Sequence, residues 1–163
     1  MVDRASNPDY NPTMDEMKRD VTECLFCSLV RGDLPSHRVC EGENFIVMLT
    51  IHPVNPGHVM VVTKEHIESF YDVEDALYTQ LMLLVKRMAL VIKHVMKPLQ
   101  VVMETSGIGN RHVHVHVIPV HDLYDRMPKE IIEKLVTYPT DDELAAVARD
   151  LATYIARGSK KTS

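Results

Sequence analysis

The sequence predicts an α+β fold in which an antiparallel sheet of about five strands packs against one long helix and a C-terminal helix. Three observations favour this class. Short β-branched runs occur between residues 39 and 63. Apolar residues recur at spacings of three and four through residues 74–97, and a second such repeat follows residue 140. Strands first, one crossing helix and a terminal helix are typical of a sheet with helices packed onto it.

The strands are predicted from apolar runs and from the turns between them. Gly42-Glu43-Asn44 suits a hairpin turn between the first two strands, and Pro56-Gly57 is a turn signal before the third. A Gly-rich segment, Gly107–Arg111, precedes the last strand. The five predicted strands are residues 39–41, 45–49, 59–63, 101–103 and 112–120.

Both helices are predicted from an apolar stripe with a recognisable end. Pro98 ends the first helix, since proline cannot continue a helical hydrogen-bond ladder. Thr140-Asp-Asp-Glu143 is a capping box that begins the second. The first stripe consists of Leu77, Leu81, Leu84, Val85, Met88, Ile92 and Val95. The second consists of Leu144, Val147, Ala148, Leu151 and Ile155.

Length and composition exclude several classes of protein. A chain of 163 residues with 45% hydrophobic and 25% charged residues is typical of one globular domain. We expect that domain over residues 21–157, with a mobile polar arm at 1–20 and a flexible tail at 158–163. A net charge of −5 argues against general nucleic-acid binding, and the absence of a long apolar stretch argues against a membrane span. Three cysteines do not make a disulfide framework, so we expect a cytoplasmic location.

Three histidines alternate with valines near the end of the predicted sheet. Successive side chains of a strand point to opposite faces, so His112, His114 and His116 share one face. The simplest interpretation is a half-buried strand whose solvent face carries histidines. A second is a metal site, but the extended rise separates His112 from His116 by about 13 Å, too far for one ion to bind all three. The opposite, apolar face consists of Val113, Val115 and Val117.

A third interpretation is nucleophilic catalysis. Imidazole has a reference pKa of about 6.5, so it is largely neutral at pH 7 and can attack phosphorus. A neighbouring imidazole can protonate the leaving group if the two titrate as a coupled pair with separated pKa values. We favour this interpretation over the metal site.

The segment His112-Val-His-Val-His-Val-Ile resembles the pattern of the histidine triad (HIT) family. Upstream segments are similar to that family in the same order: Cys24-Leu-Phe-Cys27, Gly32-Asp-Leu-Pro35, and Pro56-Gly-His58 leading to Lys64-Glu-His66. The resemblance covers about residues 24–155. It implies a HIT-like α+β domain that commonly forms homodimers by joining sheets and long helices.

The resemblance also implies an activity and a role for each histidine. HIT proteins hydrolyse or transfer nucleotidyl groups. His114 would attack the α-phosphorus and form a nucleotidyl-histidine, and His116 would contact phosphate or leaving group and help with proton transfer. His112 would orient its neighbour or bind metal, and His58 would complete the set. The expected substrates are purine nucleoside monophosphate derivatives, such as phosphoramidates or dinucleoside polyphosphates.

The expected nucleotide site departs from the family pattern at two places. Members carry Gln and a hydroxyl residue where this chain has Ile108 and Gly109, and an acidic or amide residue that holds the ribose where it has Thr50. Asn110 is a candidate to replace the lost phosphate contact. The resemblance places Leu25, Phe26, Leu29, Met48 and Ile51 around the base, although core packing explains each of them as well.

Cys24-x-x-Cys27 can be a redox pair, half of a metal site or a coincidence. Structural zinc is normally held by four nitrogen or sulfur ligands, and this motif supplies two. Resemblance to bacterial-type HIT proteins implies that His66 and His112 complete a structural zinc site. Cys40 is expected to pack in a strand without such a role.

The function we expect is nucleotidyl hydrolysis or transfer through His114, with a purine nucleotide as substrate. A rival from another class is a nucleotide- or zinc-binding adaptor with little turnover, favoured by Thr50 and Ile108. A third hypothesis is a metallo-hydrolase that uses the histidine strand. Loss of activity on chelation and recovery with metal would distinguish that enzyme from one whose zinc is structural.

Overall fold

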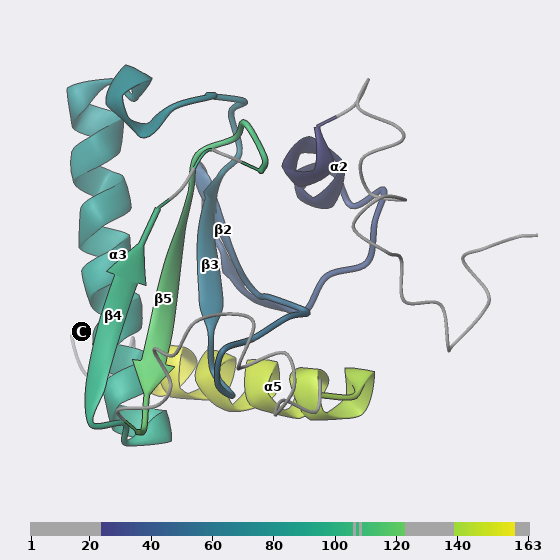
Figure 1. The fold of residues 1–163 in the computed structure, drawn as a ribbon, viewed down its shortest axis with the longest axis vertical. Helices are drawn as coiled ribbons and strands as arrows, with labels where there is room; N and C mark the ends of the chain where they lie inside the picture. Colours follow the sequence, from purple (N-terminus) through teal and green to yellow (C-terminus); the bar gives the residue numbers. More distant parts are fainter. Residues whose placement is uncertain (1–23, 106, 108, 123–138, 159–163) are drawn as a thin grey trace, which may run out of the picture.

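The computed structural model describes residues 24–105, 107, 109–122 and 139–158, which form one five-stranded antiparallel sheet with helices on both faces (Figure 1). The predicted α+β fold with a five-stranded sheet is therefore confirmed. The predicted arm at 1–20 lies outside the described residues, and so does the predicted tail at 158–163 except for Gly158, which is the last residue of the C-terminal helix. In spatial order the strands are β1 (Arg38–Glu41), β2 (Phe45–Leu49), β3 (Val59–Thr63), β5 (His114–Val120) and β4 (Gln100–Glu104).

The two predicted helices form where the sequence places them. α3 (Asp75–Met96) begins where the Glu74 carboxylate accepts hydrogen bonds from two first-turn N–H groups, and it ends at Lys97 in the left-handed conformation. α5 (Asp141–Gly158) begins with the predicted capping box. The backbone N–H of Thr140 donates to the Glu143 carboxylate at 2.8 Å, and that of Glu143 donates to the Thr140 hydroxyl at 3.3 Å. No helix in the described ranges is long and apolar enough to cross a membrane.

Two hydrophobic clusters lie on opposite faces of the sheet. On one face, alternate residues of β2, β3 and β5 pack against α3 and α5 and form the large core. On the other face a small core packs under a short helix, α2 (Leu25–Arg31). Because both faces of β2 and β3 are buried, their sequences read as continuous apolar runs. The small core consists of Phe26, Ile46, Met48, Met60 and Val62.

The structure differs from the sequence prediction in two elements. A single strand was predicted over 112–120, but β5 begins at His114. The backbone of Val113 instead forms hydrogen bonds with the end of β3 and with the segment after it. Its N–H donates to the Ile67 carbonyl, and its carbonyl accepts from the Thr63 N–H. The second difference is α2 itself, together with the 3-10 turn η2 (Phe70–Asp72), neither of which the sequence predicted.

Candidate functional site

The four histidines predicted to be catalytic lie at the centre of the sheet, on the face that α2 partly covers. His114 and His116 belong to β5, His112 precedes that strand, and His58 precedes β3. The predicted alternation is confirmed on the opposite face, where the intervening valines join the large core: Val113, Val115 and Val117. We call the side of the sheet that carries the small core and the histidines the histidine face.

His114 is held by a backbone carbonyl that also decides where its proton lies. Its Nδ1 lies 2.7 Å from the carbonyl oxygen of His112. A carbonyl only accepts, so Nδ1 carries the hydrogen and Nε2 of the neutral ring keeps its lone pair. Burial lowers the pKa of His114, which keeps the ring neutral near pH 7. The ring packs on Phe26, with centroids 4.5 Å apart.

His58 and His116 form a second directed pair. The backbone N–H of Val54 donates to Nδ1 of His58 at 3.1 Å, so the proton of the neutral His58 ring lies on Nε2. That Nε2 lies 2.9 Å from Nδ1 of His116 and donates to it. His116 therefore carries its own proton on Nε2, which places a nucleophilic nitrogen and a proton donor on neighbouring side chains.

Gly57 allows the tight turn that leads into His58. Its φ of +91° lies in the left-handed region, and a Cβ at this position would come within 2.9 Å of Met96 Cγ on α3. Only a residue without a side chain fits this turn comfortably, and the turn delivers His58 to the start of β3.

Burial of His58 predicts an acid-sensitive fold. Burial first, and then the neighbouring His116, lower the pKa of His58 from 6.5 to about 3. Between these values the unfolded chain binds a proton that the folded chain does not, so stability decreases as the pH falls. The free energy of unfolding should decrease by up to about 1.4 kcal/mol per pH unit for this group alone. Urea denaturation from pH 7 to pH 4 measures the slope.

His58→Gln is the variant that isolates this contribution, because it removes the titrating ring and keeps a polar side chain. Its slope between pH 6 and pH 4 should be smaller than that of the wild type. The lowered pKa values of His114 and His116 leave a residual slope of the same sign. An unchanged slope in His58→Gln would contradict the assignment.

The four residues predicted to bind metal come together at the end of the histidine face where α2 begins. Their ligand atoms all lie within 4.8 Å of one another: Sγ of Cys24 and Cys27, and a ring nitrogen of His66 and His112. Cys24 Sγ is 3.2 Å from Nδ1 of His112, and Cys27 Sγ is 3.3 Å from Nδ1 of His66. Cys24 precedes α2 and Cys27 lies in its first turn, so this helix supplies both thiols.

The chemistry of this cluster fits a zinc ion. Tetrahedral zinc with ordinary bond lengths separates a sulfur ligand from a nitrogen ligand by about 3.6 Å, close to the distances above. His112 is oriented for binding, since its Nε2 donates to the carbonyl of Thr63 at 2.8 Å and leaves Nδ1 unprotonated toward the thiols. The four residues could therefore hold a metal ion.

The residues predicted to bind nucleotide lie in different environments. Phe26 and Met48 are buried in the small core, and Leu29 packs against it. Thr50 is also buried, and its hydroxyl accepts a hydrogen bond from the backbone N–H of His52 at 3.3 Å. The remaining members are exposed and stay a prediction: Leu25, Ile51, Gly109 and Asn110. Ile108, where the sequence departs from the family pattern, lies outside the described residues.

Glu104 is a site residue that sequence reasoning did not identify. It stands directly opposite His116 in the register of β4 and β5, so the two side chains share the histidine face. Its carboxylate raises the pKa of His116, whereas burial and His114 lower it. Only the pairing of the strands reveals this neighbour, because eleven residues of chain, including a turn, separate the two positions.

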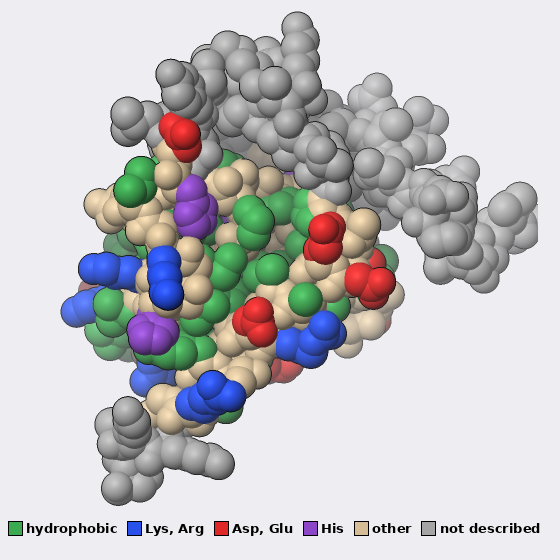
Figure 2. Space-filling model, turned by 90° about the horizontal axis from the view of Figure 1, so that it is seen from below, with side chains coloured by type: hydrophobic (Ala, Val, Ile, Leu, Met, Phe, Trp, Pro, Cys, Tyr) green, Lys and Arg blue, Asp and Glu red, His purple; other side chains and the backbone are tan. Residues whose placement is uncertain are grey.

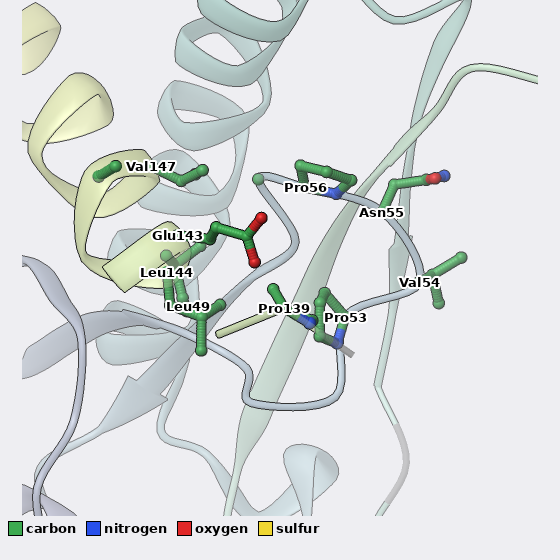
Figure 3. Close-up of a pocket in the computed structure, with 11 residues that line it drawn as sticks. Leu49, Pro53, Val54, Asn55, Pro56, Pro139, Glu143, Leu144 and Val147 are labelled. Atoms are coloured by element: carbon green, nitrogen blue, oxygen red, sulfur yellow. The ribbon is translucent and has the colours of Figure 1, made fainter. Parts of the chain in front are cut away.

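A cavity of about 480 Å³ lies away from the histidines. It lies between the loop that carries Pro53 and Pro56 and the first turns of α5, where Glu143 and Leu144 line it (Figure 3). Seen from this end of the molecule, hydrophobic side chains gather between acidic ones on one side and basic ones on the other (Figure 2). The four histidines do not line this cavity, so we do not assign the reaction to it.

Comparison with known proteins agrees with this arrangement. A family model described as HIT domain matches residues 31–123, more than half of the chain. The Bacillus subtilis protein named Protein hit is 35% identical over 101 residues, covering 59% of this chain and 70% of that protein. The adenosine 5′-monophosphoramidase HNT1 of Saccharomyces cerevisiae is 29% identical over 102 residues, covering 61% of this chain and 63% of that enzyme.

A solved structure matches the fold over most of its length. The zinc-bound histidine triad family protein of Mycobacterium smegmatis superposes with a TM-score of 0.68 at 23% identity. The match covers 85% of this chain and 97% of the other, so it includes more of the chain than the family model does.

Proposed function

Because the chain belongs to the HIT domain family, we propose that it cleaves nucleoside monophosphate derivatives through a nucleotidyl-histidine intermediate. The substrates are purine nucleoside phosphoramidates or dinucleoside polyphosphates. One observation carries the proposal: the His112 carbonyl fixes the proton of His114 on Nδ1, while the His58 pair fixes that of His116 on Nε2. The yeast relative's name, adenosine 5′-monophosphoramidase, supports the P–N bond as one that is cleaved.

In the first step, Nε2 of His114 attacks the α-phosphorus. A bond forms between phosphorus and nitrogen, and the bond from phosphorus to the leaving group breaks. His116 takes up a proton when the anionic substrate binds and so enters this step as the imidazolium. It then gives its Nε2 proton to the leaving atom and returns to a neutral ring with its proton on Nδ1, and an amine departs neutral from a phosphoramidate. The His112 carbonyl stabilises the positive charge that develops on the His114 ring through the Nδ1 hydrogen bond.

In the second step, water attacks the nucleotidyl-histidine. His116, now unprotonated at Nε2, accepts a proton from the water as the new P–O bond forms. The P–N bond to His114 breaks, and the nucleoside monophosphate leaves with both histidines restored. In the resting protein His58 keeps the His116 ring oriented, since its Nε2 donates to His116 Nδ1.

The proposal includes a structural zinc ion held by Cys24, Cys27, His66 and His112. Zinc supplies no step of the reaction. It ties α2 to the segments that precede β5 and follow β3, and it would therefore stabilise the fold around Phe26. The zinc-bound mycobacterial protein of the same fold supports this assignment.

We also propose a homodimer, in which β4 and α3 meet their copies. β4 is an edge strand of the sheet, and such edges are available for pairing. Large apolar side chains are exposed on α3, on β4 and in the turn between them: Leu83, Leu90, Leu99 and Met103. Sedimentation velocity should show a dimer for the wild type and a monomer for Leu90→Glu. A cytoplasmic location belongs to the same proposal, because three cysteines are too few for a disulfide framework.

Release of AMP tests the catalytic proposal. The wild type should form AMP from adenosine 5′-phosphoramidate or from diadenosine tetraphosphate, measured by liquid chromatography under multiple-turnover conditions. The concentration of AMP formed must exceed that of the protein, because AMP that was already bound to the protein cannot exceed it. Tight AMP binding without turnover of either substrate would instead support the nucleotide-binding adaptor.

A further inference from the structure

Glu104 places a negative charge at the proton-donating end of the site. β4 and β5 pair so that Glu104 stands opposite His116, and directly opposed residues of antiparallel strands have Cβ atoms about 5 Å apart. Glu104 is exposed, so a ligand on the histidine face can reach its carboxylate. Its neighbour Thr105 is fixed by a hydrogen bond from its hydroxyl to the His114 carbonyl at 2.9 Å, which holds this end of β4 beside the reacting strand.

This carboxylate is not neutralised by a basic side chain. Among the residues that the structure describes, Glu104 forms no ion pair, while Glu68 pairs with Arg111 and Glu41 with Lys64. His116 is neutral in the tautomer assigned above and is neutral again once it has given up its proton, so it does not cancel the charge as the leaving group departs. The field of Glu104 is therefore available to whatever lies next to His116.

The leaving group is the part of the substrate that lies there. His116 delivers its proton to the leaving atom, so the atoms beyond that atom extend along the neighbourhood of His116 and not toward the small core. A positive charge in that group is attracted by Glu104, and a negative charge is repelled. At separations of about 5–8 Å, near a protein surface, one such interaction changes a rate constant by about tenfold.

Resting on the proposed function, we propose that Glu104 selects the leaving group by charge. Nucleoside phosphoramidates whose amine carries a second, protonated nitrogen are the favoured substrates. Phosphoramidates of neutral amines are intermediate, and dinucleoside polyphosphates, which release an anionic nucleotide, are disfavoured. The substrate class is thus a nucleoside monophosphate joined through a P–N bond to an amine that carries a second, protonated nitrogen, such as a diamine.

Two matched substrates test this selection. The adenosine 5′-phosphoramidates of ethylenediamine and of n-propylamine differ in a terminal ammonium against a methyl group. For the wild type, kcat/KM should be about tenfold higher for the ethylenediamine compound. Glu104→Gln should bring the ratio close to one, and Glu104→Lys should invert it and improve diadenosine tetraphosphate as a substrate. Glu43→Gln, which removes the same charge at the turn between β1 and β2, should leave the ratio unchanged.

The possible failures are distinguishable. If AMP forms and depends on His114 but Glu104→Gln leaves the ratio unchanged, the inference is wrong and the proposed function stands. Equal losses for both amines in Glu104→Gln would make Glu104 a positioning residue for His116 and would also overturn the inference. If no substrate gives AMP in a His114-dependent manner, the proposed function fails and the inference fails with it.

Discussion

His114→Ala is expected to lower AMP release from adenosine 5′-phosphoramidate by at least about 10³-fold, because it removes the atom that forms the covalent intermediate. In the folded protein, Nε2 of His114 keeps its lone pair because Nδ1 donates to the His112 carbonyl. None of the neighbouring histidines can replace it: Nε2 of His116 carries a proton, and both ring nitrogens of His58 form hydrogen bonds. Initial rates at saturating substrate measure the loss.

The control for this result is His94→Ala. His94 lies on α3, stacks on Tyr154 and faces away from the histidine face. This variant should keep wild-type turnover. That result would show that removing a histidine outside the site does not stop the reaction. Intact-protein mass spectrometry of the wild type, quenched during turnover, should reveal one added adenylyl group that His114→Ala lacks. Comparable turnover by His114→Ala and wild type would exclude covalent catalysis through this residue.

The middle of the fold could be predicted closely because local pattern and burial agree there. β2 and β3 have the predicted bounds, 45–49 and 59–63, since each strand is buried on both faces and reads as an apolar run. The capping box before α5 is likewise local, as Thr140 and Glu143 satisfy each other within one turn. These elements needed no knowledge of the rest of the chain.

α2 could not be predicted in the same way because contacts far along the chain stabilise it. It has seven residues, fewer than an isolated helix needs. Phe26 anchors it in the small core, and the Arg38 guanidinium donates to the carbonyls of Leu29 and Val30 at its C-terminal end. Arg38 lies on β1, and the buried residues around Phe26 in the small core lie on β2 and β3, so the helix exists only once the sheet has formed.

The candidate site likewise has features that the sequence predicts and features that depend on the fold. Alternation within 112–120 predicted which side chains share the histidine face. The Cys-x-x-Cys motif supplied two candidate metal ligands, and the family resemblance supplied His58 and the other two. The tautomers of His114 and His116 follow from hydrogen bonds to a backbone carbonyl and to His58, which no sequence spacing encodes. Glu104 depends on strand register alone. Sequence therefore predicted the candidate reactive groups, while their proton positions and charge environment required the fold.

His112 connects the proposed metal centre to the reaction without entering it. Its ring nitrogen Nδ1 faces the thiol of Cys24, and its backbone carbonyl accepts a hydrogen bond from His114 Nδ1. The Thr63 carbonyl holds the same ring through Nε2, and this hydrogen bond does not require a metal. The carbonyl that positions His114 should therefore remain in place after gentle removal of zinc, provided that the sheet stays folded.

Loss of zinc is accordingly expected to reduce stability before it reduces turnover. If free zinc is about 1,000-fold above its dissociation constant, binding adds about 4 kcal/mol to the free energy of unfolding. Cys27→Ser should lose the stoichiometric zinc and unfold roughly 10 °C lower than the wild type. Metal analysis and thermal denaturation measure both effects. Chelation of the wild type should lower its Tm similarly, while most of its activity at 25 °C remains.

Cys40→Ser is the matched control, because Cys40 lies on β1, outside the four-residue cluster, and carries the same thiol. It should retain one zinc ion per chain, so a reduced zinc content would point to general loss of folding instead of a specific ligand. A chelated protein that is still folded, yet has lost its turnover and regains it when metal is added, would make the ion catalytic. That result would favour the metallo-hydrolase over the mechanism through His114, because the hydrogen bond from His112 Nε2 to the Thr63 carbonyl would then not suffice to keep the site active.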